Sequence, residues 1–402
     1  MRQPKQPTGV SQPTQWADGA FFLGLALLCG LIGGTLGFVV SATGADSQAL
    51  PLRHGILLDM FVMPVALLGG IGRWLLPARM SGGQMTLPAL DRFSAVMLAV
   101  GAMLAGCGPV TPNGLVVALL SWCAGLGGLA ASTILTVLED RPGRFRDLPV
   151  FVWSQCLGAA MVVLVTPVIA GLLTNMLIQR SATFVSLETL LEFCRPPMLV
   201  LSLVLSLGLV GAALRQDDRT VSPYLVGALS ALATVAPLAW THGVLHHDGA
   251  ITARIMPFAI ALPALLAGGL WCVTFWRERL DTSSALLWAC GALVLCMAGS
   301  VSLLTGASAS AAHSAALFGA VFAVFAGYYA WFDRVEALPV PRVMGFCHFL
   351  LAAGGVGLLV APGAAHGAAG NVLLGAALIY VLPLSLIMLV RRRVMSASGK
   401  VA

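Results

Sequence analysis

Two histidines in apolar surroundings are the side chains of this sequence with the clearest chemical potential. His54 lies in the run Arg-His-Gly-Ile-Leu-Leu-Asp-Met-Phe, and His313 lies in Ala-Ala-His-Ser-Ala-Ala-Leu-Phe. An ionisable group is costly in an apolar environment, so it marks a candidate functional site. Two neutral imidazoles on facing helices could supply both axial ligands of a heme iron. A second interpretation stays open, in which each histidine is hydrogen-bonded to backbone or water near the end of its helix.

The elements that must position these side chains are predicted to be membrane-spanning helices. The chain has 402 residues, of which 58% are apolar and only 9% are charged, whereas soluble domains carry roughly 25% charged residues. Stretches of about 20 apolar residues, long enough to cross the hydrocarbon core of a bilayer, recur along nearly the whole chain. The sequence therefore predicts an all-α polytopic membrane protein. Its net charge of +6 is too small and too scattered to indicate a nucleic-acid partner.

Twelve spans are predicted, and the charges around them indicate an orientation. The spans lie near 20–41, 55–77, 93–110, 115–138, 150–174, 196–214, 222–241, 255–276, 283–305, 312–332, 343–361 and 371–390. With both termini in the cytoplasm, 18 Lys and Arg residues fall inside and 4 outside, which is a strong positive-inside bias. In that orientation the spans that carry His54 and His313 both start at the outer face, so the two imidazoles are expected at similar depth.

The same pattern predicts the domain organisation and the location of the protein. We expect a polar cytoplasmic tail at 1–19 that is not a cleaved signal peptide, a twelve-helix domain at 20–391, and a basic cytoplasmic tail at 392–402. No soluble domain remains between the spans. We therefore expect an integral protein of a bacterial plasma (inner) membrane.

The segments around the histidines resemble subunit I of the heme-copper oxidases. His54-Gly, followed by Met-Pro and by Gly-Gly-Ile-Gly-Arg-Trp74, is similar to the second helix of that family. The run Phe145-Arg-Asp-Leu-Pro-Val-Phe-Val-Trp-Ser resembles the start of its fifth helix, and Gly319-Ala-Val-Phe-Ala-Val-Phe-Ala-Gly-Tyr resembles part of its tenth. The segments occur in the order of the family and cover essentially the whole chain. This resemblance implies a twelve-helix bundle of the heme-copper oxidase subunit I type.

The resemblance also implies one low-spin heme. The histidines that hold the low-spin heme of the family align with His54 and His313, so both axial ligands are present, for a heme of a or b type. A bis-histidine iron has no open coordination position and suits electron transfer rather than oxygen binding. Three aromatic residues are expected as neighbours of the macrocycle: Trp74, Phe322 and Phe325.

The family's apparatus for oxygen reduction is replaced in this chain. By the resemblance, the ligand of the high-spin heme aligns with Ala311, the first copper ligand with Arg195, and the tyrosine that cross-links to it with Leu199. One copper-type histidine of three remains, His242, which could form an i,i+4 pair with His246. Copper is therefore not expected, and His242 is a vestigial ligand position. The family's channel residues align with uncharged side chains, Ala267 and Gln84.

Three further charged residues lie within or beside the predicted spans. Asp59 comes five residues after His54 and is expected on roughly the opposite side of the helix, where it pairs with a polar neighbour inside the bundle or lines a polar path. Glu192 and Arg195 have helical spacing, which fits a local ion pair.

The sequence thus predicts a membrane electron-transfer subunit that holds one low-spin heme and lacks the oxygen-reducing centre and the proton channels. No catalytic residue is assigned. The expected partners are the lipid bilayer, other respiratory oxidase subunits, and a cytochrome c or quinol donor. Two alternatives stay open: a heme-free scaffold or assembly protein of a respiratory complex, and an active cytochrome oxidase with unconventional ligands that include His242, His246 and His247.

Overall fold

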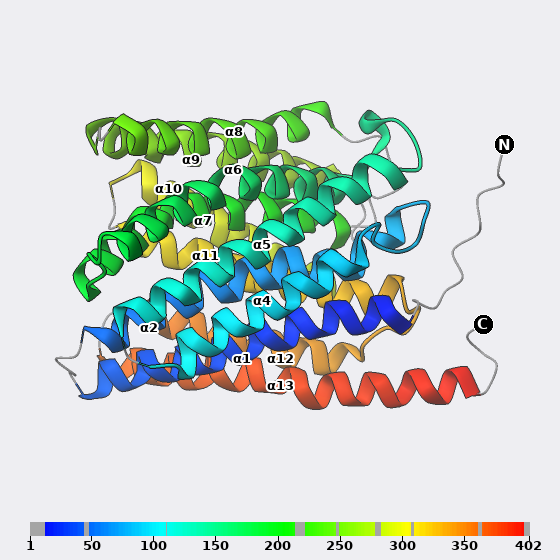
Figure 1. Ribbon diagram of the computed structural model, residues 1–402. Helices are drawn as coiled ribbons and strands as arrows, with labels where there is room; N and C mark the ends of the chain where they lie inside the picture. Colours follow the sequence, from blue (N-terminus) through cyan, green and yellow to red (C-terminus); the bar gives the residue numbers. More distant parts are fainter. Residues whose placement is uncertain are drawn as a thin grey trace.

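The chain forms a bundle of long helices that run side by side (Figure 1). The computed structural model describes residues 13–43, 48–109, 111–213, 222–246, 249–277, 283–306, 309–360 and 364–397. Within these ranges there is no strand, and twelve helices are long and apolar enough to cross a membrane. The predicted all-α fold class and the predicted number of spans are therefore confirmed. The start of α1 (Pro13–Thr43) and the end of α13 (Ala364–Ala397) lie at the same end of the bundle, as an even number of spans requires.

The second span is built from four consecutive pieces and the other spans are single helices. The second span comprises α2 (Ala49–Ile56), η1 (Leu57–Val62), η2 (Val65–Ile71) and α3 (Gly72–Leu75). The single helices between α1 and α13 are α4 (Pro88–Cys107), α5 (Pro112–Asp140), α6 (Val150–Ile178), α7 (Phe184–Ala213), α8 (Pro223–His246), α9 (Gly249–Arg277), α10 (Ser284–Leu304), α11 (Ala309–Arg334) and α12 (Arg342–Val360). Two short 3-10 turns, η3 (Pro77–Arg79) and η4 (Phe145–Asp147), lie in connections.

Helix ends depart from the prediction where polar groups prolong a helix beyond its apolar part. The predicted sixth span starts at 196, whereas α7 begins at Phe184 because Thr183 and Ser186 exchange hydrogen bonds between side chain and backbone N–H and so cap its start. At the other end of the chain, α13 continues to Ala397, because Arg392 forms an ion pair of 2.8 Å with the buried Glu336. The predicted tails at 1–19 and 392–402 thus each overlap a helix.

The second span is not a regular α-helix over its middle. Residues Leu57–Val62 and Val65–Ile71 form π-helical turns, a geometry that is rare and often found at functional sites. Side chains from neighbouring helices donate to its backbone carbonyls: Trp122 of α5 donates to Met60, and Gln155 of α6 donates to Leu67 at 3.4 Å. These donors fix the widened turns in place, and the wider turns decide which way the side chains of this span face.

Removal of the indole donor should therefore weaken the second span. We expect Trp122→Phe to lower the free energy of unfolding by about 1–2 kcal/mol, because the buried Met60 carbonyl loses its side-chain partner. Thermal unfolding in detergent measures this change. Trp153→Phe is the matched control: its indole donates to the carbonyl of Phe145 in a half-buried position that water can reach. Equal stability of the two variants would show that the Met60 contact contributes nothing.

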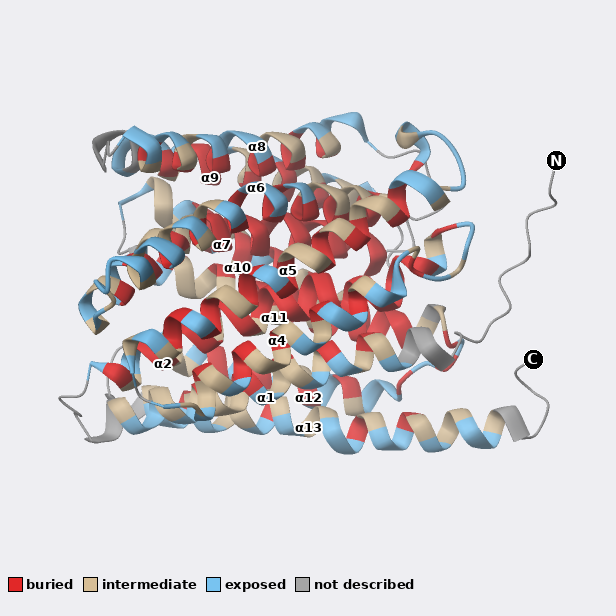
Figure 2. Cartoon of the chain, viewed as in Figure 1, coloured by how far each residue is buried: buried red, intermediate tan, exposed pale blue. Residues whose placement is uncertain are grey.

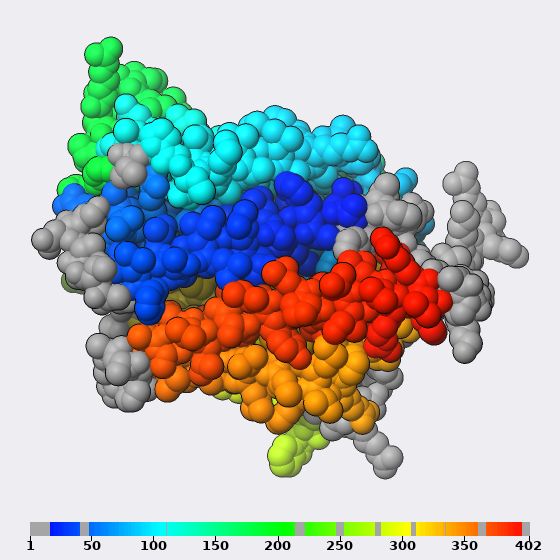
Figure 3. All heavy atoms as spheres, turned by 90° about the horizontal axis from the view of Figure 1, so that it is seen from below, coloured from blue at the N-terminus to red at the C-terminus, as the bar shows by residue number. Residues whose placement is uncertain are grey.

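Burial divides the spans into a centre and a periphery (Figure 2). In the most apolar 18 residues of each span, 94% are buried in α7 and 83% in the second span, against 22% in α1 and 17% in α13. On the face shown in Figure 3, α1 lies beside α13. The second span and α7 thus form the centre of the bundle, while α1 covers the second span from outside.

A buried ion pair ties the end of the second span to two neighbours. Arg73 is 1% exposed and donates to Asp91 of α4 at 2.7 Å, and to the Thr133 hydroxyl and the Leu129 carbonyl of α5 at 2.9 Å. It also donates to the Leu68 carbonyl of its own span. The sequence pattern had indicated only a cation on the cytoplasmic side. Its buried position makes it a structural junction of three spans.

Candidate functional site

His54 is held against the backbone of α1. Its Nδ1 lies 2.8 Å from the carbonyl oxygen of Gly33. A carbonyl can only accept, so Nδ1 carries the proton and donates, which leaves the lone pair of a neutral imidazole on Nε2. Among the described residues Nε2 has no hydrogen-bond partner. Metal-ligating histidines have this arrangement, in which one ring nitrogen donates to a carbonyl and the other faces the metal.

The close approach of His54 to α1 depends on a second glycine. A Cβ added at Gly37 would lie 2.5 Å from Cε1 of the His54 ring and 2.7 Å from Nδ1. Any larger residue there would push the imidazole away from the Gly33 carbonyl. The first ligand position is therefore set by two glycines one helical turn apart, which the sequence analysis did not single out as partners of His54.

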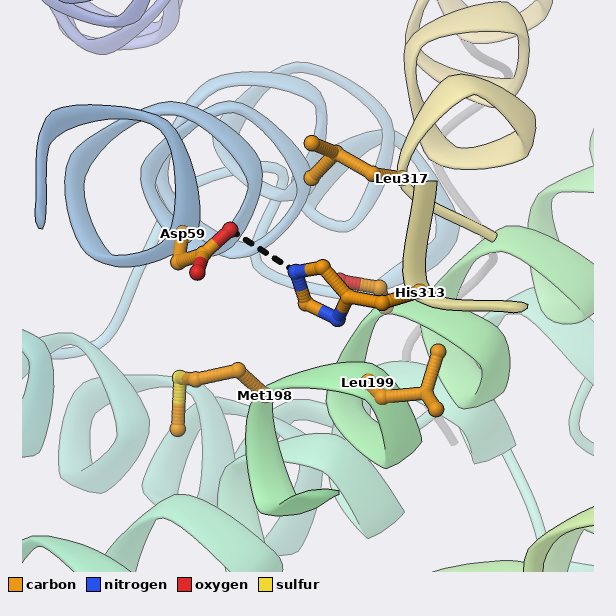
Figure 4. Close-up of a pocket in the computed structure, with 6 residues that line it drawn as sticks. Asp59, Met198, Leu199, His313 and Leu317 are labelled. Carbon is orange, nitrogen blue, oxygen red and sulfur yellow. Dashed lines mark hydrogen bonds and ion pairs between the residues drawn. The ribbon is translucent and has the colours of Figure 1, made fainter. Parts of the chain in front are cut away.

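His313 has a different partner. It lies on α11 with 16% of its side chain exposed, and its Nε2 is 2.9 Å from Oδ1 of Asp59 in η1 (Figure 4). Within the described part of the chain, its Nδ1 is buried and has no hydrogen-bond partner. The two imidazoles thus make no described contact with each other: His54 contacts α1, and His313 contacts Asp59 of the second span.

Asp59 lies at the centre of a small polar network. It is 6% exposed, and its Oδ2 lies 3.8 Å from Nε of Arg195, which in turn pairs with Glu192. The predicted ion pair between Glu192 and Arg195 is therefore confirmed, as is the expectation that Asp59 pairs with a polar group inside the bundle. No pattern in the sequence indicated that this group is His313, 254 residues further along the chain.

A small cavity adjoins the pair. It has a volume of about 10 Å³, room for about one water molecule, and opens beside Asp59 and His313 (Figure 4). The residues that line it come from the second span, α7 and α11: Asp59, Met198, Leu199, Ser202, His313 and Leu317. A heme needs far more room than this cavity offers, so a heme ligated by His313 requires the side chain to move away from Asp59.

The two ligand positions are separated along the second span. Asp59 follows His54 by five residues, which is about 7 Å of helix rise, and Asp59 contacts His313. His54 can act as an axial ligand in its present position, because its Nε2 has no hydrogen bond to the described residues. The His313 position does not fit an axial ligand as it stands, because its Nε2 is bonded to Asp59.

The three aromatic residues expected near a heme pack against other aromatic side chains. Trp74 stacks on Trp331 with ring centroids 5.2 Å apart, and it lies roughly 25–30 Å along the second span from His54, so its place beside a heme stays a prediction. Phe322 and Phe325 pack on Trp288 with centroids 4.9 and 4.7 Å apart.

A buried histidine lies in that aromatic cluster. His348 of α12 is fully buried, and its Nδ1 lies 2.9 Å from the hydroxyl of Tyr329. Trp288, Phe325 and Tyr380 pack around its ring.

His242 makes no described contact with either proposed ligand. His242 and His246 are exposed at the end of α8, and their ring centroids are 4.4 Å apart, as i,i+4 spacing predicts. His247 lies outside the described residues. Within the residues that are described, no three His, Cys, Asp or Glu side chains gather closely enough to hold a metal ion.

Comparisons with known proteins place this chain among relatives of one kind. No model of a protein family matches it. It is 25% identical to cytochrome c oxidase subunit 1 of Cereibacter sphaeroides, over 77% of this chain and 65% of the relative. It is also 25% identical to a probable cytochrome c oxidase subunit 1-alpha of Streptomyces avermitilis, over 77% of this chain and 62% of that protein. It is likewise 25% identical to a probable cytochrome c oxidase subunit 1-beta of Nocardia farcinica, over 83% of this chain and 66% of that protein. The chain spans just under two thirds of the length of these relatives.

Proposed function

Because this chain is a divergent member of the heme-copper oxidase subunit I family, we propose that it holds one low-spin heme and transfers electrons as a membrane-embedded subunit of a respiratory complex. One observation carries the proposal: His54 donates Nδ1–H to the Gly33 carbonyl and leaves Nε2 free of described partners. His313 is the proposed second ligand. When bound, a bis-histidine heme supplies reversible one-electron transfer at an iron with no open position.

The side chains of this chain position such a group and exclude water from it. The Gly33 carbonyl fixes the orientation of the His54 ring, and the glycine surface of α1 lets the ring lie close to that helix. Leu57 is fully buried beside Gly33, so the protein around the first ligand is apolar on this side. Low polarity and a fixed imidazole are what an electron-transfer heme requires of its protein.

We further propose that oxygen reduction is lost. Ala311 offers no ligand for a second heme, and Leu199 borders the small cavity where the family has a tyrosine. Arg195 stands where the family has its first copper ligand, and it forms ion pairs with Asp59 and Glu192. A guanidinium at this place repels a metal cation, because it is always charged.

The proposed setting is the plasma membrane of a bacterium, with both termini in the cytoplasm and a cytochrome c or quinol as electron donor. This orientation is supported by the charges, since it places 18 Lys and Arg residues on the cytoplasmic side and 4 on the outer side. The even number of spans agrees with it.

A heme-free structural subunit is the second candidate, and one observation favours it. The bond between His313 and Asp59 satisfies the second proposed ligand without any metal. The heme content of the purified protein separates the two candidates, since only the first requires a heme.

The glycine surface under His54 provides a sharp test of the first candidate. We expect Gly37→Ala to lower heme content severalfold, because its new Cβ would lie 2.5 Å from the His54 ring. Gly34→Ala is the matched control on the same helix, since a Cβ at that position meets nothing within 4 Å. Heme per chain, measured by pyridine extraction, checks both variants. Equal heme content in the two variants would count against His54 as a ligand.

A further inference from the structure

A buried phenol and a buried imidazole form a hydrogen bond between α11 and α12. The hydroxyl of Tyr329 lies 2.9 Å from Nδ1 of His348, and both side chains are almost completely buried. A buried phenol O–H needs an acceptor, and Nδ1 of His348 is the acceptor that Tyr329 has among the described residues. Tyr329 therefore donates, and a neutral His348 carries its lone pair on Nδ1 and its proton on Nε2.

This geometry is that of an acid and its base. A general base must lie within about 2.6–3.2 Å of the group whose proton it takes, and Nδ1 of His348 meets this condition. Proton transfer alone would create a phenolate and an imidazolium in apolar surroundings, which is costly. When the phenol loses an electron at the same time, its oxygen stays neutral and only the imidazolium is charged. The hydrogen bond therefore favours one-electron oxidation of Tyr329 over its ionisation.

Aromatic rings surround this pair on several helices. Trp288 of α10 stacks on Tyr329, with ring centroids 6.2 Å apart and an interplanar angle of 19°. The ring of Tyr328 lies 5.5 Å from that of Tyr329, and Tyr380 of α13 stacks on His348 with centroids 5.4 Å apart. Phenols and indoles are the side chains that lose an electron most readily. An electron that leaves Tyr329 thus has neighbouring rings to pass through.

Tyr380 connects the pair to the surface of the bundle. Its side chain is half-buried, whereas Tyr329 is almost completely buried. The helix that carries Tyr380, α13, has only 17% of its most apolar 18 residues buried, and it lies on the outside of the bundle in Figure 3. An oxidant dissolved in the lipid therefore meets α13 and exchanges an electron with Tyr329, without direct contact with the phenol.

We propose that Tyr329 and His348 form a redox-active pair that gives one electron to peroxyl radicals of the surrounding lipid. The electron leaves Tyr329 through the neighbouring rings, the O–H bond of the phenol breaks, and an N–H bond forms at Nδ1 of His348. The peroxyl radical takes the electron and a proton from interfacial water and becomes a hydroperoxide. A membrane quinol then returns one electron to Tyr329 and releases a proton to water, while the proton on Nδ1 passes back to the phenol. This function needs no iron and is independent of the proposed axial ligands.

Flash oxidation with a ruthenium tris-bipyridine complex and persulfate tests the pair in the detergent-purified full chain. The chain has four tyrosines, and Tyr224→Phe serves as the background because Tyr224 is exposed and reacts directly with the oxidant. In this background we expect a tyrosyl radical in the electron paramagnetic resonance spectrum, and Tyr329→Phe should remove it. Tyr328→Phe is the matched control and should keep it, because the Tyr328 hydroxyl pairs with Ser385 and not with an imidazole.

The variant His348→Gln separates a proton acceptor from a hydrogen-bond partner. The amide oxygen of glutamine accepts the phenol O–H but does not take its proton. We therefore expect the radical yield to fall severalfold in a chain that thermal unfolding shows to be folded. Isotope-labelled histidine gives a second signature, a coupling between the radical and the imidazole nitrogen that the variant lacks. No radical in the background protein, an equal radical in Tyr329→Phe, or an unchanged yield in His348→Gln would overturn the proposal.

Proteoliposomes test the proposed oxidant. In vesicles of polyunsaturated phosphatidylcholine oxidised by a lipid-soluble azo initiator, the Tyr224→Phe background should delay the formation of conjugated dienes, because each hydroperoxide that the pair forms ends one radical chain. Addition of Tyr329→Phe should shorten the delay, whereas addition of Tyr328→Phe should leave it unchanged. Equal delays with and without Tyr329→Phe would overturn the proposed reaction with peroxyl radicals. Heme content plays no part in this readout, so its failure leaves the proposed heme function as it stands.

Discussion

Replacement of His54 by alanine is expected to abolish the low-spin heme spectrum of the purified protein. Nε2 of His54 carries the lone pair that can bind a metal, because Nδ1–H donates to the Gly33 carbonyl. Outer partners of a ligating histidine are worth roughly 10–100-fold in metal affinity, so loss of the ligand itself should cost more than about 100-fold. Heme per chain and the absorption spectrum after purification measure this loss.

A histidine of the same chain serves as control. His242 is exposed at the end of α8, far along the sequence from both proposed ligands, and His242→Ala should keep full heme content. His313→Ala should lose the bis-histidine spectrum as well. If both His54→Ala and His313→Ala retained a normal low-spin spectrum, the assignment of the axial ligands would be wrong.

The largest expected loss of stability comes from the other end of the second span. Arg73→Leu leaves the 3% exposed Asp91 without its cation, and it removes donors from Thr133 and from two backbone carbonyls. Removing one partner of a buried ion pair costs about 3–5 kcal/mol, because the remaining charge stays buried and unpaired. Thermal unfolding in detergent should therefore show a strongly lowered Tm.

Two further variants show whether the loss is due to the unpaired charge. In the double variant Arg73→Leu with Asp91→Leu no charge is left unpaired, so it should recover part of the lost stability. Arg92→Leu is the matched control on α4, since this arginine is exposed, and its effect should stay within about 0.5 kcal/mol. A double variant less stable than Arg73→Leu alone would contradict the explanation.

The spans could be predicted from the sequence because a bilayer demands about 20 apolar residues in each. Their ends could not. Thr183 and Ser186 cap α7 twelve residues before its predicted start, and Arg392 prolongs α13 by pairing with Glu336. Such contacts involve polar side chains outside the apolar run, where hydropathy carries no information.

The candidate site was predictable only in part. Motifs around His54 and His313 marked them as a pair, but no periodicity links Gly33 to His54 or His313 to Asp59. These contacts depend on which helices pack together and on the π-helical turns of the second span, which change the direction in which Asp59 faces. The sequence indicated that Asp59 has a polar partner inside the bundle, yet it could not show that this partner is the other histidine.

A dithionite-reduced minus oxidised spectrum of the purified full chain shows whether the protein binds one low-spin heme. The heme content and a carbon monoxide trace are recorded on the same sample. We expect a sharp alpha band, one heme per chain and no shift with carbon monoxide. Absence of a Soret band would leave a heme-free structural subunit. A species that binds carbon monoxide would contradict the closed bis-histidine iron.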